Sequence, residues 1–245
     1  MFAKLLNDER IRENKVCKST MSKLISDSQV KLNASLHTND KNFGARTDGA
    51  GTALHLSMAL IKLKESGLCQ SILDYGTGKG FLVKQLQQEL PTDILVRGYD
   101  PAILEYKDKP QSPSDIVTCL DVLEHIEMNS IDYVLRDIRA LTARICYLVI
   151  DLQPAVKKLA DGRNAHILLA PPDWWVSRVS QVFPCITAFP VMHRSGLPQK
   201  LVIAACLKPK TIPYMYRFVH HLGAHSIIQA GGNLETVVNY NNNNK

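Results

Sequence analysis

A glycine-rich turn between a short apolar strand and a helix is the feature that most limits how this chain can fold. Residues 71–75 read Ser-Ile-Leu-Asp-Tyr, and the loop 76–80, Gly-Thr-Gly-Lys-Gly, follows at once. Apolar residues at 81, 82, 86 and 90 then predict a helix that ends before Pro91. Glycines allow a tight turn and a close approach of backbone to a ligand, and a helix N-terminus favours negative groups. The pattern predicts the ligand-binding turn of an α/β domain.

The rest of the chain alternates between expected strands and expected helices. Strands are expected at 94–99, 115–120 and 144–151, helices at 131–142 and 171–183, and a closing strand pair at 186–192 and 201–207. Residues 103–114 are polar and contain proline, so a strand there must be short or missing. This order predicts an α/β, Rossmann-like, doubly wound and mostly parallel sheet with an antiparallel final strand, plus N-terminal helices.

Three regions follow from this organisation. Residues 1–66 form an N-terminal helical and loop segment, with amphipathic helices in 1–30, a loop at 37–52 and a helix near 53–65. Residues 67–208 form the α/β domain. Residues 209–245 read as a C-terminal tail, partly disordered, with an aromatic and basic cluster at 214–221 and a terminal run of asparagines.

Acidic residues stand at the ends of three expected strands. Asp74 lies two residues before the first glycine, Asp100 ends the next strand 26 residues later, and Asp121 ends the strand after that. A carboxylate in the position of Asp100 can accept hydrogen bonds from both hydroxyls of a ribose. Asp100 therefore indicates a ligand that contains a ribose.

These motifs resemble those of the class I S-adenosylmethionine-dependent methyltransferases. The family's acidic-x-Gly-x-Gly-x-Gly motif is met in full by residues 74–80, and residues 121–126, Asp-Val-Leu-Glu-His-Ile, look like its motif after the fourth strand. The resemblance covers roughly residues 70–208. It implies S-adenosylmethionine as cofactor, with the glycines against its methionine part, Asp74 near its amino group and Asp100 on its ribose. The cofactor-binding candidates are Asp74, Gly76, Thr77, Gly78, Gly80, Asp100 and Asp121.

Two alternatives keep the fold and change the function. A domain that binds NAD also places an acid after its second strand, but it favours Gly-x-Gly-x-x-Gly, whereas this loop reads Gly-x-Gly-x-Gly. A non-catalytic, cofactor-binding scaffold subunit is the other alternative. A dead site need not retain the glycines and Asp100, so methyl transfer is favoured.

The segment after the third of these strands carries the candidates for chemistry. Asp121, His125 and His166 are candidate catalytic groups, because a base helps to deprotonate a hydroxyl or amine acceptor. Asp121, Glu124, His125 and His166 also form a plausible set for Mg²⁺ or Mn²⁺. This set looks similar to that of the small-RNA 3′-end 2′-O-methyltransferases and some quinone O-methyltransferases. The alternative is that Glu124 and His125 only cap a helix or bond to backbone.

The acceptor is less constrained by the sequence. Arg163, Asn164 and Trp174 are candidate substrate residues. They follow the strand expected at 144–151, which corresponds to the family's fifth strand, and acceptors bind after that strand in this family. His37 and His55 are interpreted as incidental. The motifs for methylation of adenine amino groups and of cytosine C5 are missing at the strand end, which disfavours both classes of DNA methyltransferase. We expect an oxygen or nitrogen acceptor on a small molecule or an RNA end.

Charge and cysteine usage fit this interpretation. The chain has 245 residues, a formal net charge of +6 and a pI near 9.0, which permits an anionic partner such as RNA bound by the N-terminal helices and residues 208–225. Its six cysteines occur singly among apolar neighbours, so we expect free thiols and no cysteine-rich zinc site. Without a signal peptide or an apolar run long enough for a membrane span, the chain is expected in the reducing cytoplasm.

Overall fold

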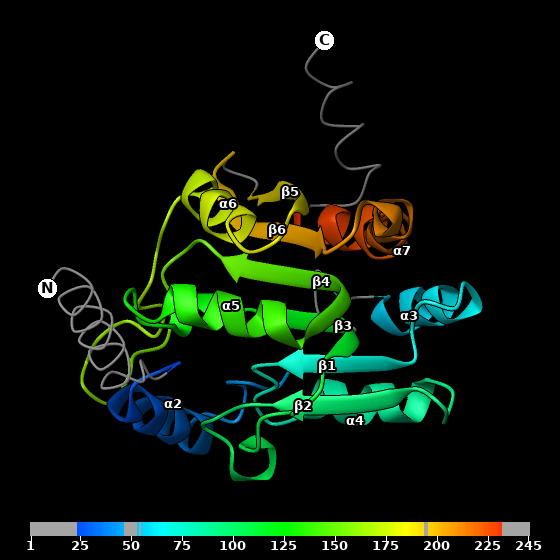
Figure 1. The fold of residues 1–245 in the computed structure, drawn as a ribbon. Helices are drawn as coiled ribbons and strands as arrows, with labels where there is room; N and C mark the ends of the chain where they lie inside the picture. The colour runs from blue at the N-terminus through cyan, green and yellow to red at the C-terminus, as the bar shows by residue number, and fades with distance from the viewer. Residues whose placement is uncertain (1–23, 47–52, 54, 194–195, 232–245) are drawn as a thin grey trace, which may run out of the picture.

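The computed structural model describes residues 24–46, 53, 55–193 and 196–231, with backbone alone for 223–231 (Figure 1). A six-stranded sheet in the order β2-β1-β3-β4-β6-β5 forms its centre. The strands are β1 (Ser71–Tyr75), β2 (Leu95–Tyr99), β3 (Ser114–Leu120), β4 (Thr142–Asp151), β5 (Cys185–Met192) and β6 (Pro198–Cys206).

The pairing of the strands confirms the predicted fold class. Strand β1 pairs in parallel with β2 and β3, and β3 pairs in parallel with β4. Strand β6 is antiparallel to both β4 and β5. The chain passes from β1 outward to β2 and then crosses to β3 on the other side of β1, so the strand order reverses between β1 and β3. Ligands of α/β sheets bind in the crevice at such a point.

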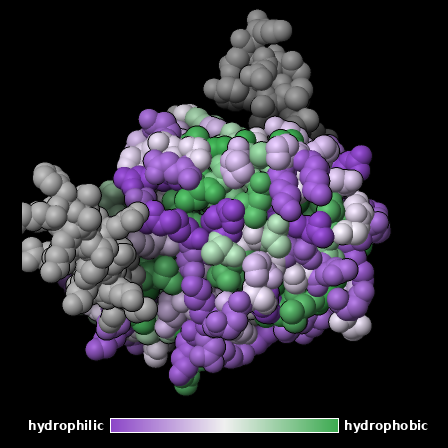
Figure 2. All heavy atoms as spheres, in the orientation of Figure 1, coloured by the Kyte–Doolittle hydropathy of each residue, from purple (hydrophilic) through white to green (hydrophobic). Residues whose placement is uncertain are grey.

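Helices cover both faces of the sheet. Helices α3 (Leu56–Glu65), α4 (Phe81–Glu89) and α7 (Ile212–Gly231) share one buried apolar cluster with the sheet, and α5 (Ile131–Leu141) and α6 (Pro172–Ser180) share the other. Each helix turns its apolar side inward, as α5 does with Ile131, Leu135 and Ile138. The face seen in Figure 2 is accordingly mainly hydrophilic, with scattered apolar patches.

The connection after β2 holds no strand, as its composition predicts. Residues 104–106 form one 3-10 turn, and the side chain of Leu104 is exposed. The guanidinium of Arg97 donates to the carbonyls of Ser112 and Pro113 and to the Ser114 hydroxyl, at 2.7–3.2 Å. These bonds return the chain to β3 without a further element of the sheet.

The predicted tail at 209–245 is wrong for its first part. Helix α7 packs on α3 and on the last two strands through Met215, Phe218 and Leu222, which are buried. These residues stand at i, i+3 and i+7, which places them on one helix face. Aromatic and basic neighbours mask this stripe in the sequence. Residues 232–245 lie outside the described residues.

Helix α2 (Asp27–Asn39) extends across the carboxyl edge of the sheet (Figure 1). Its N-cap Ser26 accepts from the Gln29 backbone, and the Ser26 N–H donates to Glu127 at 2.9 Å. The predicted loop at 37–52 therefore begins only after Asn39. The other apolar positions of the expected N-terminal helices, in residues 1–23, lie outside the described residues.

The described cysteines carry free thiols, as expected. Cys69, Cys119, Cys146 and Cys206 are buried, and Cys185 is half-buried. Cys17 lies outside the described residues. Among the helices that the structure describes, none is both long and apolar enough to cross a bilayer.

Candidate active site

A cavity of about 590 Å³ opens at the carboxyl edge of β1, β3 and β4. The glycine loop and the end of β2 form one wall, and the turns that follow β3 and β4 form another. Helix α2 and the residues that follow it contribute a third wall. We call residues 40–46 the strap. The lining of the cavity includes His37, Phe43, Arg46, Asp74, Gly76, Thr77, Gly78, Tyr99, Asp100, Asp121, Val122, His125, Asp151, Gln153, Lys157, Ala165 and His166.

The glycine loop is fixed by hydrogen bonds to the end of β2. The N–H groups of Gly76 and Thr77 both donate to the carbonyl of Tyr99, at 2.7 and 3.1 Å. Gly76 has φ +77°, and a Cβ there would collide with Val122. Gly80 also has a positive φ, but it packs against Tyr106 outside the cavity, so its predicted contact with the cofactor is not supported.

Asp100 and Asp74 both line the cavity and are both almost fully buried. The Asp100 carboxylate accepts from the N–H groups of Gly78 (3.0 Å) and Ala102 (2.9 Å). Asp74 accepts from the Thr118 hydroxyl at 2.9 Å. Burial raises the pKa of the Asp74 carboxyl, against the opposing effects of the Thr77 and Thr118 hydroxyls. Both acids stand where the sequence predicts a cofactor's polar groups.

The strap crosses directly over the glycine loop, which the sequence did not reveal. The Lys79 N–H donates to the Gly44 carbonyl at 2.8 Å, and the Lys79 ammonium donates to the Asp40 carbonyl at 2.7 Å. The Asp40 carboxylate pairs with Lys157 at 2.8 Å, which ties the strap to the loop after β4.

His37, interpreted as incidental from the sequence, lies in this cavity. Its ring packs on Phe43 with 4.5 Å between ring centroids. Burial lowers the pKa of His37. The short polar run at 37–46 gives no local signal for this placement, because the contacts join segments far apart in the chain.

The close approach of strap and loop makes Gly78 sensitive to substitution. A Cβ at Gly78 would lie 2.6 Å from the Gly44 oxygen and 2.7 Å from its Cα, at φ +54°. We expect Gly78→Ala to lower the free energy of unfolding by about 2–4 kcal/mol, the sum of backbone strain and steric overlap. Gly67→Ala is the matched control, since Gly67 has φ +70° and nothing within 4 Å of its added Cβ. Denaturant unfolding of the two variants measures the difference, and equal losses would contradict the close approach.

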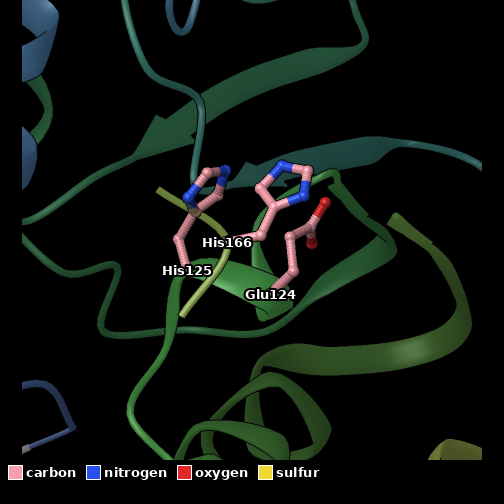
Figure 3. Close-up of side chains that lie close together, drawn as sticks. All are labelled: Glu124, His125 and His166. Carbon is pink, nitrogen blue, oxygen red and sulfur yellow. The ribbon is translucent and has the colours of Figure 1, made fainter. Parts of the chain in front are cut away.

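Glu124, His125 and His166 come together beside the cavity (Figure 3). Their ligand atoms all lie within 4.8 Å of one another, and the two rings are 4.9 Å apart between centroids. Two atoms bound to one ion at about 2.1 Å can be separated by up to about 4 Å, so a small closure would let the group share a cation.

The hydrogen bonds of the two imidazoles fix their tautomers. His125 Nδ1 lies 2.7 Å from the Ala165 carbonyl, and His166 Nδ1 lies 2.5 Å from the Gln153 carbonyl. A carbonyl oxygen only accepts, so both Nδ1 atoms carry a hydrogen, and Nε2 is the atom that holds the lone pair in the neutral form of each ring. Burial, together with His166, lowers the pKa of His125 to about 4, which keeps that ring neutral.

Glu124 is fully buried, and one of its carboxylate oxygens is not satisfied within the described residues. Oε1 accepts from the Asp151 N–H at 3.0 Å, whereas Oε2 has no hydrogen-bond partner among them. Burial raises the pKa of Glu124 to about 7. A buried carboxylate oxygen beside two imidazole lone pairs is the arrangement of a cation site.

Asp121 stands apart from this group, contrary to the predicted metal set. Its carboxylate binds Lys200, with Nζ–O distances of 2.7 and 2.8 Å, and pairs with Arg46. Lys200 also lies 3.6 Å from Asp151. Asp121 has φ +54°, the one positive φ among the described non-glycine residues. The sequence did not predict either cation, because Arg46 and Lys200 come from segments far from Asp121. In the structure, Lys200 faces Asp151 across β4 and β6.

The three predicted substrate residues do not line the cavity. Arg163 pairs with Asp161 and donates to the Gln29 side chain at 3.1 Å. Asn164 is engaged within its own loop. Trp174 packs under the Arg178 guanidinium, 4.7 Å from the ring centroid, while its neighbour Trp175 is fully buried. The prediction of a substrate role for these side chains is therefore not supported.

The chain matches no protein-family model, and no curated protein matches its sequence. Solved structures similar to it include a DhpI–SAH complex, at 13% identity over 75% of this chain and 99% of that chain, with a TM-score of 0.47. The methyltransferase domain of a bacterial Hen1 matches at 13% identity over 63% and 99%, with a TM-score of 0.45. Magnesium protoporphyrin IX methyltransferase from Synechocystis, with bound SAH, matches at 16% identity over 64% and 83%, with a TM-score of 0.44. By its own sheet order and glycine turn, the chain has the Rossmann-like α/β fold.

Proposed function

We propose that the chain is an S-adenosylmethionine-dependent methyltransferase that acts on an oxygen of its acceptor. The observation that carries the proposal is one cavity that joins the glycine loop, Asp74 and Asp100 to two histidines whose Nδ1 atoms are held by backbone carbonyls. The cofactor supplies a methyl group already activated by a sulfonium. The protein then needs chiefly to align the acceptor and to help remove its proton.

The cofactor end of the cavity fits this ligand. Backbone at Gly76 and Gly78 leaves room where a side chain would collide with neighbours. The Asp74 carboxylate complements an ammonium group, and Asp100 retains acceptor capacity for ribose hydroxyls beyond its two backbone bonds. Tyr99 and Val122 add apolar surface to the same cavity. An adenosine with a charged amino-acid tail matches this distribution.

The other end fits a divalent cation held by Glu124, His125 and His166. Two neutral imidazoles and one carboxylate are donors that suit Mn²⁺ and similar transition metals better than Mg²⁺, which prefers oxygen alone. A bound cation would lower the pKa of a hydroxyl that coordinates it. This chemistry favours an oxygen acceptor over a nitrogen acceptor. We assign Asp121 no catalytic role, because Lys200 and Arg46 neutralise its carboxylate.

The first test is transfer of radiolabelled methyl from S-adenosylmethionine into fractionated cell extract, with small metabolites, RNA, DNA and protein counted separately. We expect label in the small-molecule or RNA fraction, stimulated by Mn²⁺ and abolished by EDTA. Label that ignores EDTA would remove the metal and leave His166 as candidate base. No label despite measured cofactor binding would favour the scaffold alternative.

Metal binding should depend on pH through Glu124. Its pKa of about 7 means that a proton competes with the cation near neutrality, whereas His125, with a pKa of about 4, stays neutral. We expect the affinity for Mn²⁺ to fall as pH is lowered from about 8 to about 6, by up to about tenfold per unit below 7. Calorimetric titration measures this, and a flat profile would contradict it.

The metal-free protein gives an independent check of the same carboxyl group. The folded state raises the pKa of Glu124 from 4.5 to about 7, so it binds the proton more tightly than the unfolded chain does. The contribution of Glu124 to stability is therefore greatest at low pH and is lost as pH rises from about 4.5 to about 7. Glu124→Gln should remove this component from the pH profile of unfolding.

A further inference from the structure

The loop after β4, residues 152–168, supplies most of what holds the two histidines. It contributes His166 itself, the Gln153 carbonyl that binds His166, and the Ala165 carbonyl that binds His125. The loop also returns to the segment after β3, where the Leu168 N–H donates to the Glu124 carbonyl at 3.0 Å. The positions of both rings therefore depend on the conformation of a connection without helix or strand.

Asn164 closes this loop with three hydrogen bonds from one side chain. Its Oδ1 accepts from the Ala155 N–H at 3.0 Å and from the His166 N–H at 2.9 Å. Its Nδ2 donates to the Ala155 carbonyl at 2.8 Å. The side chain thus bridges two backbone segments nine residues apart and hydrogen-bonds to both the N–H and the carbonyl of Ala155.

The neighbours of Asn164 are the groups that hold the histidines. Ala165, directly after it, is fully buried and gives its carbonyl to His125, while its own N–H donates to the Lys157 carbonyl at 3.0 Å. His166 follows, with its N–H on the Asn164 side chain. We infer that Asn164 is a positioning residue that sets the orientation of both His125 and His166, and that it does not contact the acceptor.

The expected effect of Asn164 on metal binding rests on the proposed function, whereas its hydrogen bonds within the loop do not depend on that function. Arg163, the preceding residue, provides a contrast in the same loop. Its side chain is half exposed and pairs with Asp161 and Gln29, with no bond to either histidine or to the backbone of residues 164–166. A change at Arg163 should therefore leave the imidazoles as they are.

The experiment compares Asn164→Ala, Asn164→Asp and Arg163→Ala by three readouts. Nitrogen-15 NMR of the metal-free protein reports the tautomers of His125 and His166, calorimetry reports the affinity for Mn²⁺, and a second titration reports the affinity for S-adenosylhomocysteine. Asn164→Ala should lose the uniform Nδ1–H tautomer and weaken Mn²⁺ binding about 10–100-fold. Its affinity for S-adenosylhomocysteine should stay within about twofold, because none of the three hydrogen bonds of the Asn164 side chain involves Asp100 or the glycine loop.

The two other variants make the test decisive. Asn164→Asp keeps both accepting bonds of Oδ1 but sets a second acceptor oxygen against the Ala155 carbonyl, so it should disturb the tautomers less than Asn164→Ala does. Arg163→Ala should match the wild type in all three readouts. Wild-type tautomers in Asn164→Ala, or equal damage from Arg163→Ala, would overturn the inference. A wild-type protein that binds no Mn²⁺ would instead overturn the proposed metal, while the NMR comparison would still decide the role of Asn164.

Discussion

Replacing His166 with alanine should lower the rate of methyl transfer by about a hundredfold or more, with little change in cofactor affinity. Among the described residues, His166 supplies one of the three candidate ligand atoms, and because its Nδ1 is engaged by the Gln153 carbonyl, Nε2 is the nitrogen that can bind a cation. Asp100 and the glycine loop contribute none of these atoms. The loss should therefore appear in kcat and in metal affinity, with the dissociation constant for S-adenosylhomocysteine within about twofold of wild type.

The matched control for this substitution is His220→Ala, on the exposed side of α7. It removes an imidazole far from the cavity and should leave the rate unchanged. Full activity in His166→Ala would show that the histidine takes no part in the chemistry. An inactive His166→Ala in an enzyme that ignores EDTA and Mn²⁺ would assign His166 as a base and remove the cation.

Replacing Asp100 with alanine should weaken the binding of S-adenosylhomocysteine by about a hundredfold. The substitution removes the carboxylate expected to bind the ribose hydroxyls. It also leaves the N–H groups of Gly78 and Ala102 without their acceptor. A hydrogen bond to a charged group is worth about 1.5–3 kcal/mol, so the loss of the two bonds from the ribose hydroxyls suffices for the expected change in affinity.

Calorimetric titration measures this loss, and Asp108→Ala, a change of an exposed acid in the same connection, is its control. Asp100→Asn should be milder than Asp100→Ala, because the amide oxygen can still accept one of the two backbone bonds. Unchanged affinity in Asp100→Ala would place the cofactor elsewhere and would remove the assignment of this cavity.

The order of strands and helices and the position of the glycine loop could be predicted from the sequence because both are local. The apolar run of residues 71–75 and the glycines after it specify strand and turn without help from distant residues. The antiparallel closing pair follows from two apolar runs joined by a short turn. The missing strand at 103–114 follows from its polar, proline-containing composition.

The parts that could not be predicted depend on contacts between distant segments. The approach of Gly44 to Gly78 joins residues 34 positions apart, and no local pattern announces it. The cations on Asp121 come from Arg46 and Lys200, on either side of it in the chain.

Arg163 and Asn164 are predicted substrate residues because they lie in a polar loop at the place where acceptors bind in the family that the sequence resembles. In the structure, the Asn164 side chain forms its hydrogen bonds with backbone groups of the same loop. A polar side chain that hydrogen-bonds to backbone groups and one that binds a ligand can be the same residue type, so the sequence does not distinguish them. Only the partners of each donor and acceptor separate the two roles.

The strap has a consequence for turnover. Its Gly44 carbonyl and its Asp40 carboxylate tie it to Lys79 and Lys157, across the side of the cavity that holds the glycine loop. A spent cofactor that leaves on this side must wait until these contacts open. Residence time is then governed by a local opening of the N-terminal segment rather than by the strength of contacts in the cavity.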